Sequence, residues 1–270
     1  MPIFTFLIPV RHPANSRDWA RTKANISETV RSISAQTSSN WRGLIVANEG
    51  SDLPVLPERF NVEWVHFPPN SMHEQVGQSR EDFLDAFRFD KGRRVLKGML
   101  RARDSRFIMV VDDDDFISSR IVQFSSDHEN ANGWVIDRGY CWSDGSAVLQ
   151  QLDDFNRTCG TSHIIRSDLY GLPNTFEEAT PDYIKTMLGS HYRLAESMAE
   201  RGVPLESLPF RGAVYRVGHS SSHSLTPGIL KLLFLNRQAI RNPRQMLKDL
   251  KQLRMVSGAI KHEFFGVARQ

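Results

Sequence analysis

The chain begins with short apolar runs that alternate with segments of helical periodicity. Near-continuous apolar runs of this length are typical of strands buried on both faces of a parallel sheet. Four such runs are Ile3–Val10, Gly43–Ala47, Val62–Phe67 and Phe107–Val111. A helix is predicted after the first run, with Asn25 and Glu28 as a capping box. A second helix is predicted over Asp90–Arg103.

This order of elements predicts an α/β fold, with a Rossmann-like nucleotide-binding sheet and helices on both faces. Ligands of such sheets bind at the carboxyl ends of the strands. The polar loops after Val10, Ala47 and Val111 are therefore expected to meet at the site.

The second half of the chain is less regular. It predicts short strands and one helix that ends at Gly202, a natural C′ residue. The strands are Trp134–Ile136, Ser162–Ile165 and Ala213–Val217, and the helix lies within Asp182–Arg201.

Residues 225–270 are expected to form a basic helical extension. They hold nine Lys and Arg against two Asp and Glu, a charge of +7, whereas residues 1–224 carry −4. In the last predicted helix, Leu250, Leu253, Ile260 and Phe264 share one face, and Arg244, Lys248 and Lys251 lie on another. Such a helix can lie on an anionic membrane surface, pack on the preceding domain or form a dimer interface.

Overall composition excludes several classes of protein. Apolar residues are 40% and charged residues 24% of the 270, which is typical of a globular protein. A net charge of only +3 argues against a nucleic-acid binder. Two cysteines make no disulfide framework, and no signal peptide or membrane-spanning run is visible. We expect a cytoplasmic protein, peripheral at the inner face of a membrane if the basic extension binds lipid.

Four adjacent aspartates, Asp112–Asp115, directly follow the fourth apolar run. Alternate side chains at the end of a strand point the same way, so we expect Asp112 and Asp114 to share one face and Asp113 and Asp115 the other. Paired carboxylates are ligands for Mg²⁺ or Mn²⁺, whose shell substrate phosphates usually complete. A solvated acidic turn is the structural alternative.

Basic and histidine side chains accompany the aspartates. Lys91, Arg93, Arg94 and Lys97 precede them on the second predicted helix and could hold a diphosphate. His219, with His223 nearby, follows a strand and could ligate Mn²⁺. His191 or Asp182 could act as a general base for an incoming hydroxyl.

These segments resemble the GT-A fold glycosyltransferases, most nearly the family 2 type that assembles bacterial surface polysaccharides. The resemblance rests on Phe6–Arg11, Asn25–Gln36, Leu44–Asp52, Phe107–Ser118, Tyr192–Pro204 and Tyr215–His219, within about residues 3–224. Asp112, Asp114 and Asp115 match the family motif Asp-x-Asp-Asp, with Asp113 in the variable slot.

The resemblance implies a GT-A-like catalytic domain over residues 1–224 that uses Mn²⁺ or Mg²⁺. Residues 1–118 would bind a UDP- or GDP-linked sugar, and residues 119–224 a glycan or lipid-linked acceptor. Metal ligands would be Asp112, Asp114 and His219. The expected nucleotide-binding residues are Pro9, Val10, Arg11, Asn48, Glu49, Lys91, Arg94, Lys97, Asp112 and Asp113. The expected acceptor or sugar contacts are Trp142, Asp144 and Asp115.

The chain departs from the family pattern at two places that bear on function. Asn48-Glu49-Gly50-Ser51 replaces the usual Asp-Asp-Gly-Ser, so Glu49 would contact the base and the nucleotide stays open. Ser190-His191 occupies the place of the acceptor-side Glu-Asp pair, which makes His191 the candidate base. An inverting transfer is the simplest outcome, with a retaining one still open.

Two other functions compete with this interpretation. A sugar nucleotidyltransferase usually carries a Gly-rich phosphate loop after the first strand, and Arg11–Asn15 contains no glycine. A non-enzymatic protein that binds membranes or nucleic acid through the basic tail leaves the aspartates unexplained.

Overall fold

Two β-sheets organise the protein. The computed structural model describes residues 3–73, 79–218 and 250–268. Within these ranges, the larger sheet has seven strands in the order β10-β6-β9-β4-β1-β2-β3. Their bounds are β1 (Phe4–Pro9), β2 (Trp41–Asn48), β3 (Phe60–Val65), β4 (Phe107–Val110), β6 (Gly133–Val135), β9 (His163–Arg166) and β10 (Glu206–Ser207).

Strand order places a ligand crevice between β1 and β4. The chain runs outward from β1 through β2 to β3 and then returns to the other side of β1 as β4, and all these pairings are parallel. The strand order therefore reverses between β1 and β4. In an open α/β sheet, ligands bind at such a reversal, beyond the carboxyl ends of the two strands.

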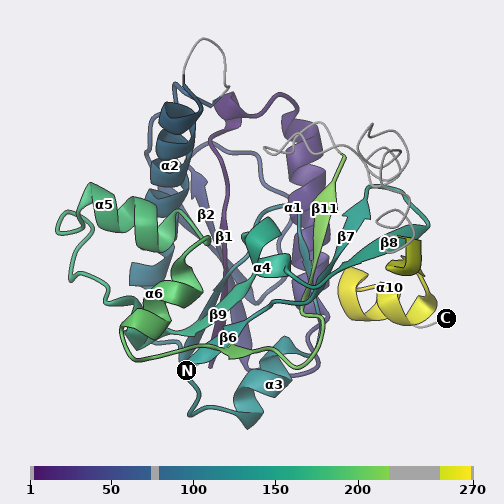
Figure 1. Ribbon diagram of the computed structural model, residues 1–270. Coiled ribbons are helices and arrows are strands. Elements are labelled where there is room, and N and C mark those ends of the chain that lie inside the picture. Colours follow the sequence, from purple (N-terminus) through teal and green to yellow (C-terminus); the bar gives the residue numbers. More distant parts are fainter. Residues whose placement is uncertain (1–2, 74–78, 219–249, 269–270) are drawn as a thin grey trace.

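Helices cover both faces of the larger sheet (Figure 1). α1 (Trp19–Ser34) and α3 (Ile121–Asp127) pack on one face with Phe4, Phe6 and Ile8. α2 (Arg80–Arg101) and α6 (Leu194–Glu200) pack on the other face with Leu7. Since β1 is buried on both sides, its apolar run is continuous rather than alternating. The predicted α/β fold class is confirmed.

The smaller sheet has five described strands in the order β12-β8-β7-β11-β5 and lies beside the carboxyl end of β4. Their bounds are β5 (Phe116–Ile117), β7 (Gly139–Ser143), β8 (Val148–Leu152), β11 (Ala213–Val217) and β12 (Leu253–Met255). α10 (Gly258–Phe265) packs Phe264 and Phe265 against this sheet. Short elements connect the strands and helices, among them η1 (Pro13–Asn15), α4 (Phe155–Thr158) and η2 (Ser167–Tyr170).

Two predictions about helix boundaries are wrong. α1 begins at Trp19, where the Asp18 side chain accepts a hydrogen bond from the Arg21 amide at 2.9 Å. Asn25 and Glu28 are therefore interior residues of α1, and they are not its cap. The helix predicted across residues 250–264 is interrupted, because β12 pairs with β8 and Ser257 caps a new helix, α10. Arg244 and Lys248 lie outside the described residues.

The helix predicted within Asp182–Arg201 is broken into three pieces. They are α5 (Pro181–Tyr183), the single π-helical turn η3 (Ile184–Leu188) and α6. The break after η3 follows from a close approach to α2, since a Cβ on Gly189 would lie 1.9 Å from the Arg88 carbonyl oxygen. Gly202, with φ of +75°, lies just beyond α6 and ends it as predicted.

Replacing Gly92 with alanine is expected to destabilise the fold through the α2–η3 contact. The new Cβ would lie 2.2 Å from the Ile184 carbonyl oxygen and 2.9 Å from its carbon, both backbone atoms that cannot rotate away. We expect a loss of about 1–3 kcal/mol in the free energy of unfolding, measured in urea. Gly258→Ala is the matched control, because a Cβ there would meet none of the described residues within 4 Å beyond its own surroundings in α10. Equal stability of Gly92→Ala and the parent protein would contradict this packing.

Candidate functional site

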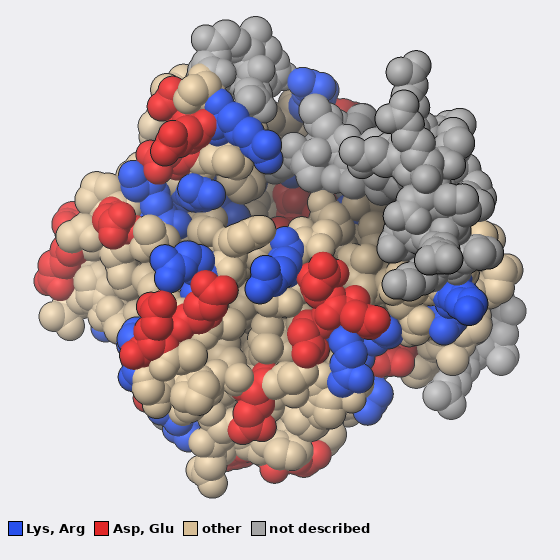
Figure 2. Space-filling view, viewed as in Figure 1, with Lys and Arg blue, Asp and Glu red and all other residues tan. Residues whose placement is uncertain are grey.

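A cleft of about 290 Å³ opens beside α2, at the reversal of strand order between β1 and β4. Figure 2 shows the hollow on this face, with acidic atoms deep inside it. Pro9 and Arg11 enter from the end of β1, and Asp112, Asp113 and Asp114 enter from the end of β4. Among the described residues, its acidic, basic and histidine lining comprises four aspartates (Asp90, Asp112, Asp113, Asp114), three cations (Arg11, Lys91, Arg94) and two histidines (His73, His191).

The aspartates after β4 form a turn rather than a continuing strand. β4 ends at Val110, and the Asp115 amide donates to the Asp112 carbonyl oxygen at 3.2 Å. The predicted alternation of faces is therefore wrong. Three carboxylates of the turn line the cleft, whereas Asp115 is fully buried behind it.

Asp115 anchors this turn through contacts to three other segments. Its Oδ2 accepts hydrogen bonds from Thr161 Oγ1 at 2.6 Å and from Cys159 Sγ at 3.1 Å. Its Oδ1 accepts from the backbone amide of Arg216 at 3.2 Å, and its carbonyl oxygen accepts from Thr29 Oγ1 at 2.9 Å. Burial raises the pKa of Asp115 well above 3.8, and the charges of Asp114 and Asp112 raise it further. The expected role of Asp115 in contacting a sugar has no support in this placement.

Cations from two elements neutralise the cleft carboxylates. Lys91 Nζ on α2 forms an ion pair with Asp112, and Arg11 lies 3.6 Å from Asp113. Burial alone would lower the pKa of Lys91, but the adjacent Asp112 carboxylate outweighs burial and raises it. Lys91 is therefore charged at neutral pH.

Gly160 leaves room for the Lys91–Asp112 pair. A Cβ there would lie 2.8 Å from Asp112 Oδ2 and 3.0 Å from Lys91 Nζ. The neighbouring residue, Thr161, accepts a hydrogen bond from the Asp112 amide at 2.9 Å. The segment held by Asp115 thus also supports the ion pair from behind.

Most of the Arg94 guanidinium is buried and bonded to neighbouring side chains. It is 1% exposed, donates to Asn48 Oδ1 at 2.6 Å and pairs with Asp90 at 3.4 Å. Burial lowers the pKa of Arg94, partly offset by Asp90. Asn48 also donates to the Phe67 carbonyl oxygen at 2.6 Å, so it joins the loops after β2 and β3.

Several residues predicted to bind nucleotide lie away from the cleft lining. Asn48 is buried under Arg94, Val10 is buried in the core, and exposed Glu49 pairs with His66 at 2.9 Å. Lys97 Nζ lies over the Phe176 ring at 4.5 Å. The sequence predicted that the loop after β2 would line the cleft, and this prediction is wrong for Asn48 and Glu49.

Trp142 and Asp144 also lie elsewhere, around the buried side chain of Arg216. The Arg216 guanidinium lies 5.5 Å from the Trp142 ring centroid and 4.0 Å from Asp144 Oδ1. It also donates to Asn25 Oδ1 at 2.7 Å and pairs with Glu28 on α1. These contacts hold α1 to the smaller sheet, which gives Trp142 and Asp144 a structural position.

His191 lines the cleft beside Lys91, just after the turn η3. Gly92 and Gly189 make this possible, because their missing side chains let η3 and its following loop touch the backbone of α2. Burial, together with the positive charge of Lys91, lowers the pKa of His191 to about 4, although the Asp112 carboxylate partly offsets these effects. Its imidazole is therefore neutral at neutral pH. Asp182 is exposed in the first turn of α5, outside the lining.

An apolar wall of the cleft was missed by sequence reasoning. Phe83, Leu84 and Phe87 form it, and the Phe83 and Phe87 rings stack at 6.5 Å. The helix was predicted to start at Asp90, ten residues after its true start at Arg80. Helical spacing would have revealed the shared face of Phe83, Leu84, Phe87, Asp90, Lys91 and Arg94.

The cleft chemistry fits a divalent cation bound together with an anionic ligand. In the described ranges, no group of three His, Cys, Asp or Glu side chains could hold a metal, and His219 lies outside those ranges. The described lining nevertheless carries four carboxylates against three cations. An anionic ligand entering it requires further positive charge, and hard carboxylate oxygens are suitable ligands for Mg²⁺ or Mn²⁺.

Within residues 3–73, 79–218 and 250–268, no helix has both the length and the apolar character needed to cross a membrane.

Comparisons with known proteins give likenesses of fold at low identity. No protein-family model matches the chain, and neither does any curated protein. S. aureus TarS 1–349 is 12% identical over 81% of this chain and 61% of its own, with a TM-score of 0.43. In complex with UDP, it is 14% identical over 80% and 61%, also with 0.43. A candidate nucleotide-diphospho-sugar transferase from Desulfovibrio desulfuricans G20 is 13% identical over 93% and 96%, with a TM-score of 0.38.

This chain spans about three fifths of the length of the TarS 1–349 structures. The chemistry of the cleft, rather than these likenesses, bears on function.

Removing the Lys91 cation is expected to raise the pKa of His191. In Lys91→Met, His191 loses a cation that lowers its pKa and faces an unpaired Asp112 carboxylate, so both changes favour the imidazolium. The pKa should move from about 4 toward the ordinary 6.5. NMR titration of the imidazole protons measures it, with His191→Gln to assign the signal. Lys97→Met is the matched control, and a shift of the same size there would contradict a local effect.

Removing the Asp115 carboxyl group is expected to change how stability depends on pH. Its folded pKa is raised, so above pH 3.8 the unfolded chain releases the proton before the folded protein does. The folded state then binds more protons, and this group lowers stability as pH rises. The difference in unfolding free energy between the parent and Asp115→Asn should therefore shift in favour of Asp115→Asn with increasing pH.

Urea unfolding at a series of pH values above 4 measures this difference. Asp182→Asn, which removes one exposed carboxyl group, is the control. A constant difference between the parent and Asp115→Asn over the series would refute a raised pKa.

Proposed function

We propose that this protein is a metal-dependent glycosyltransferase that moves a sugar from a nucleotide-diphosphate sugar to an acceptor hydroxyl. The observation that carries this proposal is the meeting of three carboxylates after β4 with Arg11 after β1 and Lys91 on α2, at the reversal of strand order. Such a combination suits a diphosphate with its divalent cation. The cleft volume of about 290 Å³ is near the lower end for small-molecule sites.

The donor would bind by an exchange of ionic partners. Asp112 and Asp114 would hold Mn²⁺ or Mg²⁺, which supplies positive charge to the diphosphate as it leaves. Lys91 and Arg11, which now pair with Asp112 and Asp113, would turn toward the phosphate oxygens. The flat base or ribose would pack on the apolar wall of Phe83 and Phe87, which replaces the contact expected from Glu49.

His191 would act as the general base. Its neutral imidazole would take the proton of the acceptor hydroxyl while the oxygen bonds to the anomeric carbon and the nucleotide diphosphate leaves. Bound phosphates place negative charge near this ring, which raises its pKa toward the range useful for proton transfer. The half of the chain before residue 118 would thus bind the donor, and the later half would supply the base.

The acceptor class is part of the proposal. A glycan or a lipid-linked glycan, as used in surface polysaccharide or glycolipid assembly, agrees with the family resemblance of the aspartate motif.

Nucleotide binding is expected to depend on metal and on Asp114. Calorimetric titration of UDP and of GDP, with and without Mn²⁺, should give binding of one nucleotide with the metal present. Asp114→Ala should weaken that binding at least about tenfold, or about 1.4 kcal/mol, because a carboxylate ligand is lost. Asp182→Ala, which removes an exposed carboxylate outside the cleft, should bind as the parent does.

A further variant separates donor binding from catalysis. His191→Gln should bind the nucleotide normally, since the base is assigned to the acceptor step. A folded parent protein that binds neither nucleotide under any metal condition would overturn the proposed function.

A further inference from the structure

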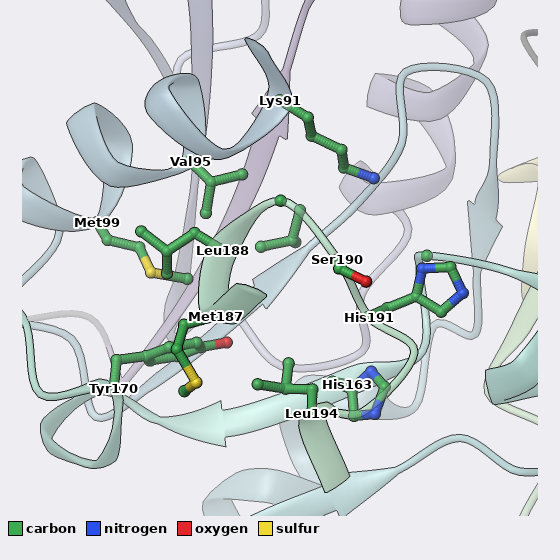
Figure 3. A pocket seen from close by; sticks show the side chains of 13 residues that line it. Lys91, Val95, Met99, His163, Tyr170, Met187, Leu188, Ser190, His191 and Leu194 are labelled. Atoms are coloured by element: carbon green, nitrogen blue, oxygen red, sulfur yellow. The ribbon is translucent and has the colours of Figure 1, made fainter. Parts of the chain in front are cut away.

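A second, smaller cavity lies behind His191 (Figure 3). Its volume is about 30 Å³, and it shares Lys91, Gly160, Gly189 and His191 with the cleft. Val95 and Leu194 close its apolar side, whereas His163 and Ser190 give it polar walls. A cavity needs about 10–15 Å³ to hold one water molecule, together with two to four polar partners.

Among the described residues, two histidine nitrogens at this cavity lack protein partners. His163 is 4% exposed, and its Nδ1 lies 3.1 Å from Ser162 Oγ. Its Nε2 is buried with no hydrogen-bond partner in the described part of the chain, and the same holds for Nε2 of His191. Figure 3 shows both imidazoles on the same side of the cavity. Buried polar atoms are nearly always hydrogen-bonded, so two such atoms at one cavity point to a shared partner.

The charge state of the two rings defines what that partner must be. Burial lowers the pKa of His163 to about 3, with a small contribution from His191, and burial lowers that of His191 to about 4. Both rings are therefore neutral at neutral pH, and each has one N–H donor and one acceptor nitrogen. A water molecule can accept from one ring and donate to the other.

We propose that this cavity holds one water molecule that joins Nε2 of His191 to Nε2 of His163, and that His163 is a positioning residue for His191. The His191 Nε2–H would donate to the water, and the water would donate to His163 Nε2. His163 Nδ1–H would then donate to Ser162 Oγ. Ser190, on the cavity wall, can take the second hydrogen of the water.

This chain of hydrogen bonds selects one tautomer of His191. Because Nε2 carries the proton, Nδ1 keeps its lone pair and is the nitrogen left for the cleft. On the proposed function, that lone pair receives the proton of the acceptor hydroxyl. The role of the tautomer in catalysis rests on the proposed function, but the tautomer itself does not.

NMR of the ligand-free protein with ¹⁵N-labelled histidine tests the proposal directly. Long-range ¹H–¹⁵N correlations report which ring nitrogen is protonated. We expect His191 as the Nε2–H form in the parent protein and a mixture of both forms in His163→Leu. His163→Gln, whose side-chain oxygen can replace the acceptor nitrogen, should restore the parent tautomer. His128→Leu, which removes a histidine bonded to the Phe124 carbonyl oxygen, should leave His191 unchanged.

Two outcomes would overturn the proposal. One is a predominant Nδ1–H form of His191 in the parent, and the other is an unchanged tautomer in folded His163→Leu. If His163→Leu does not fold, nuclear Overhauser contacts between the ring protons of His163 and His191 and a long-lived water in the parent decide the matter. Their absence would also overturn it.

Failure of the transferase assignment gives a different result. If the protein shows this tautomer but binds no nucleotide, the bridging water is supported and the proposed function is refuted. If it binds nucleotide but shows the other tautomer, the proposed function is supported and the bridging water is refuted.

Discussion

The architecture of the cleft depends on one buried carboxyl group, that of Asp115. Four aspartates in sequence would repel one another on any regular strand, and this protein resolves the conflict by burying the last of them. Its oxygens accept hydrogen bonds from Thr161, Cys159 and the Arg216 amide. One carboxyl group therefore joins the turn to the segment 159–161 and to β11. The other three carboxylates are then directed to the cleft at the end of β4. The Asp115 side chain is thus a structural support of the acidic turn, although its residue type alone resembles that of a ligand.

Charge balance gives the cleft its second constraint. Lys91 and Arg11 come from different elements, yet each meets one carboxylate of the turn. These pairs keep the charge of the cleft close to neutral, and on the proposed function they supply both signs of charge that a metal diphosphate needs. Arg94 has a different task, because its bonds to Asn48 and Asp90 hold α2 against the loop after β2. Of these two cations on α2, Lys91 therefore pairs with a carboxylate of the cleft, whereas Arg94 serves in packing.

Backbone contacts place the candidate base. Gly92 and Gly189 allow η3 and its following loop to lie directly on α2, with no side chain of their own between them. A π-helical turn next to a functional loop is a common arrangement. Here it delivers His191 to the same cleft as Lys91, which comes from a distant part of the chain. The histidine is shielded enough to stay neutral, and the small cavity behind it gives its buried nitrogen access to His163.

The sequence by itself determined the α/β class, the central strands and the place of the acidic turn, because strand burial on two faces leaves a continuous apolar signature. It also marked His191 and Lys91 by residue type, and Arg11 through the family resemblance. Tertiary structure alone decided which aspartate is buried. It also decided that five predicted site residues lie outside the cleft lining: Asn48, Glu49, Lys97, Trp142 and Asp144. Residues 253–255, which local periodicity predicts as helix, form a strand because they pair with β8. Each of these outcomes depends on partners distant in the chain, such as Arg216 for Asn25 and Asp144, and local periodicity carries no information about such pairings.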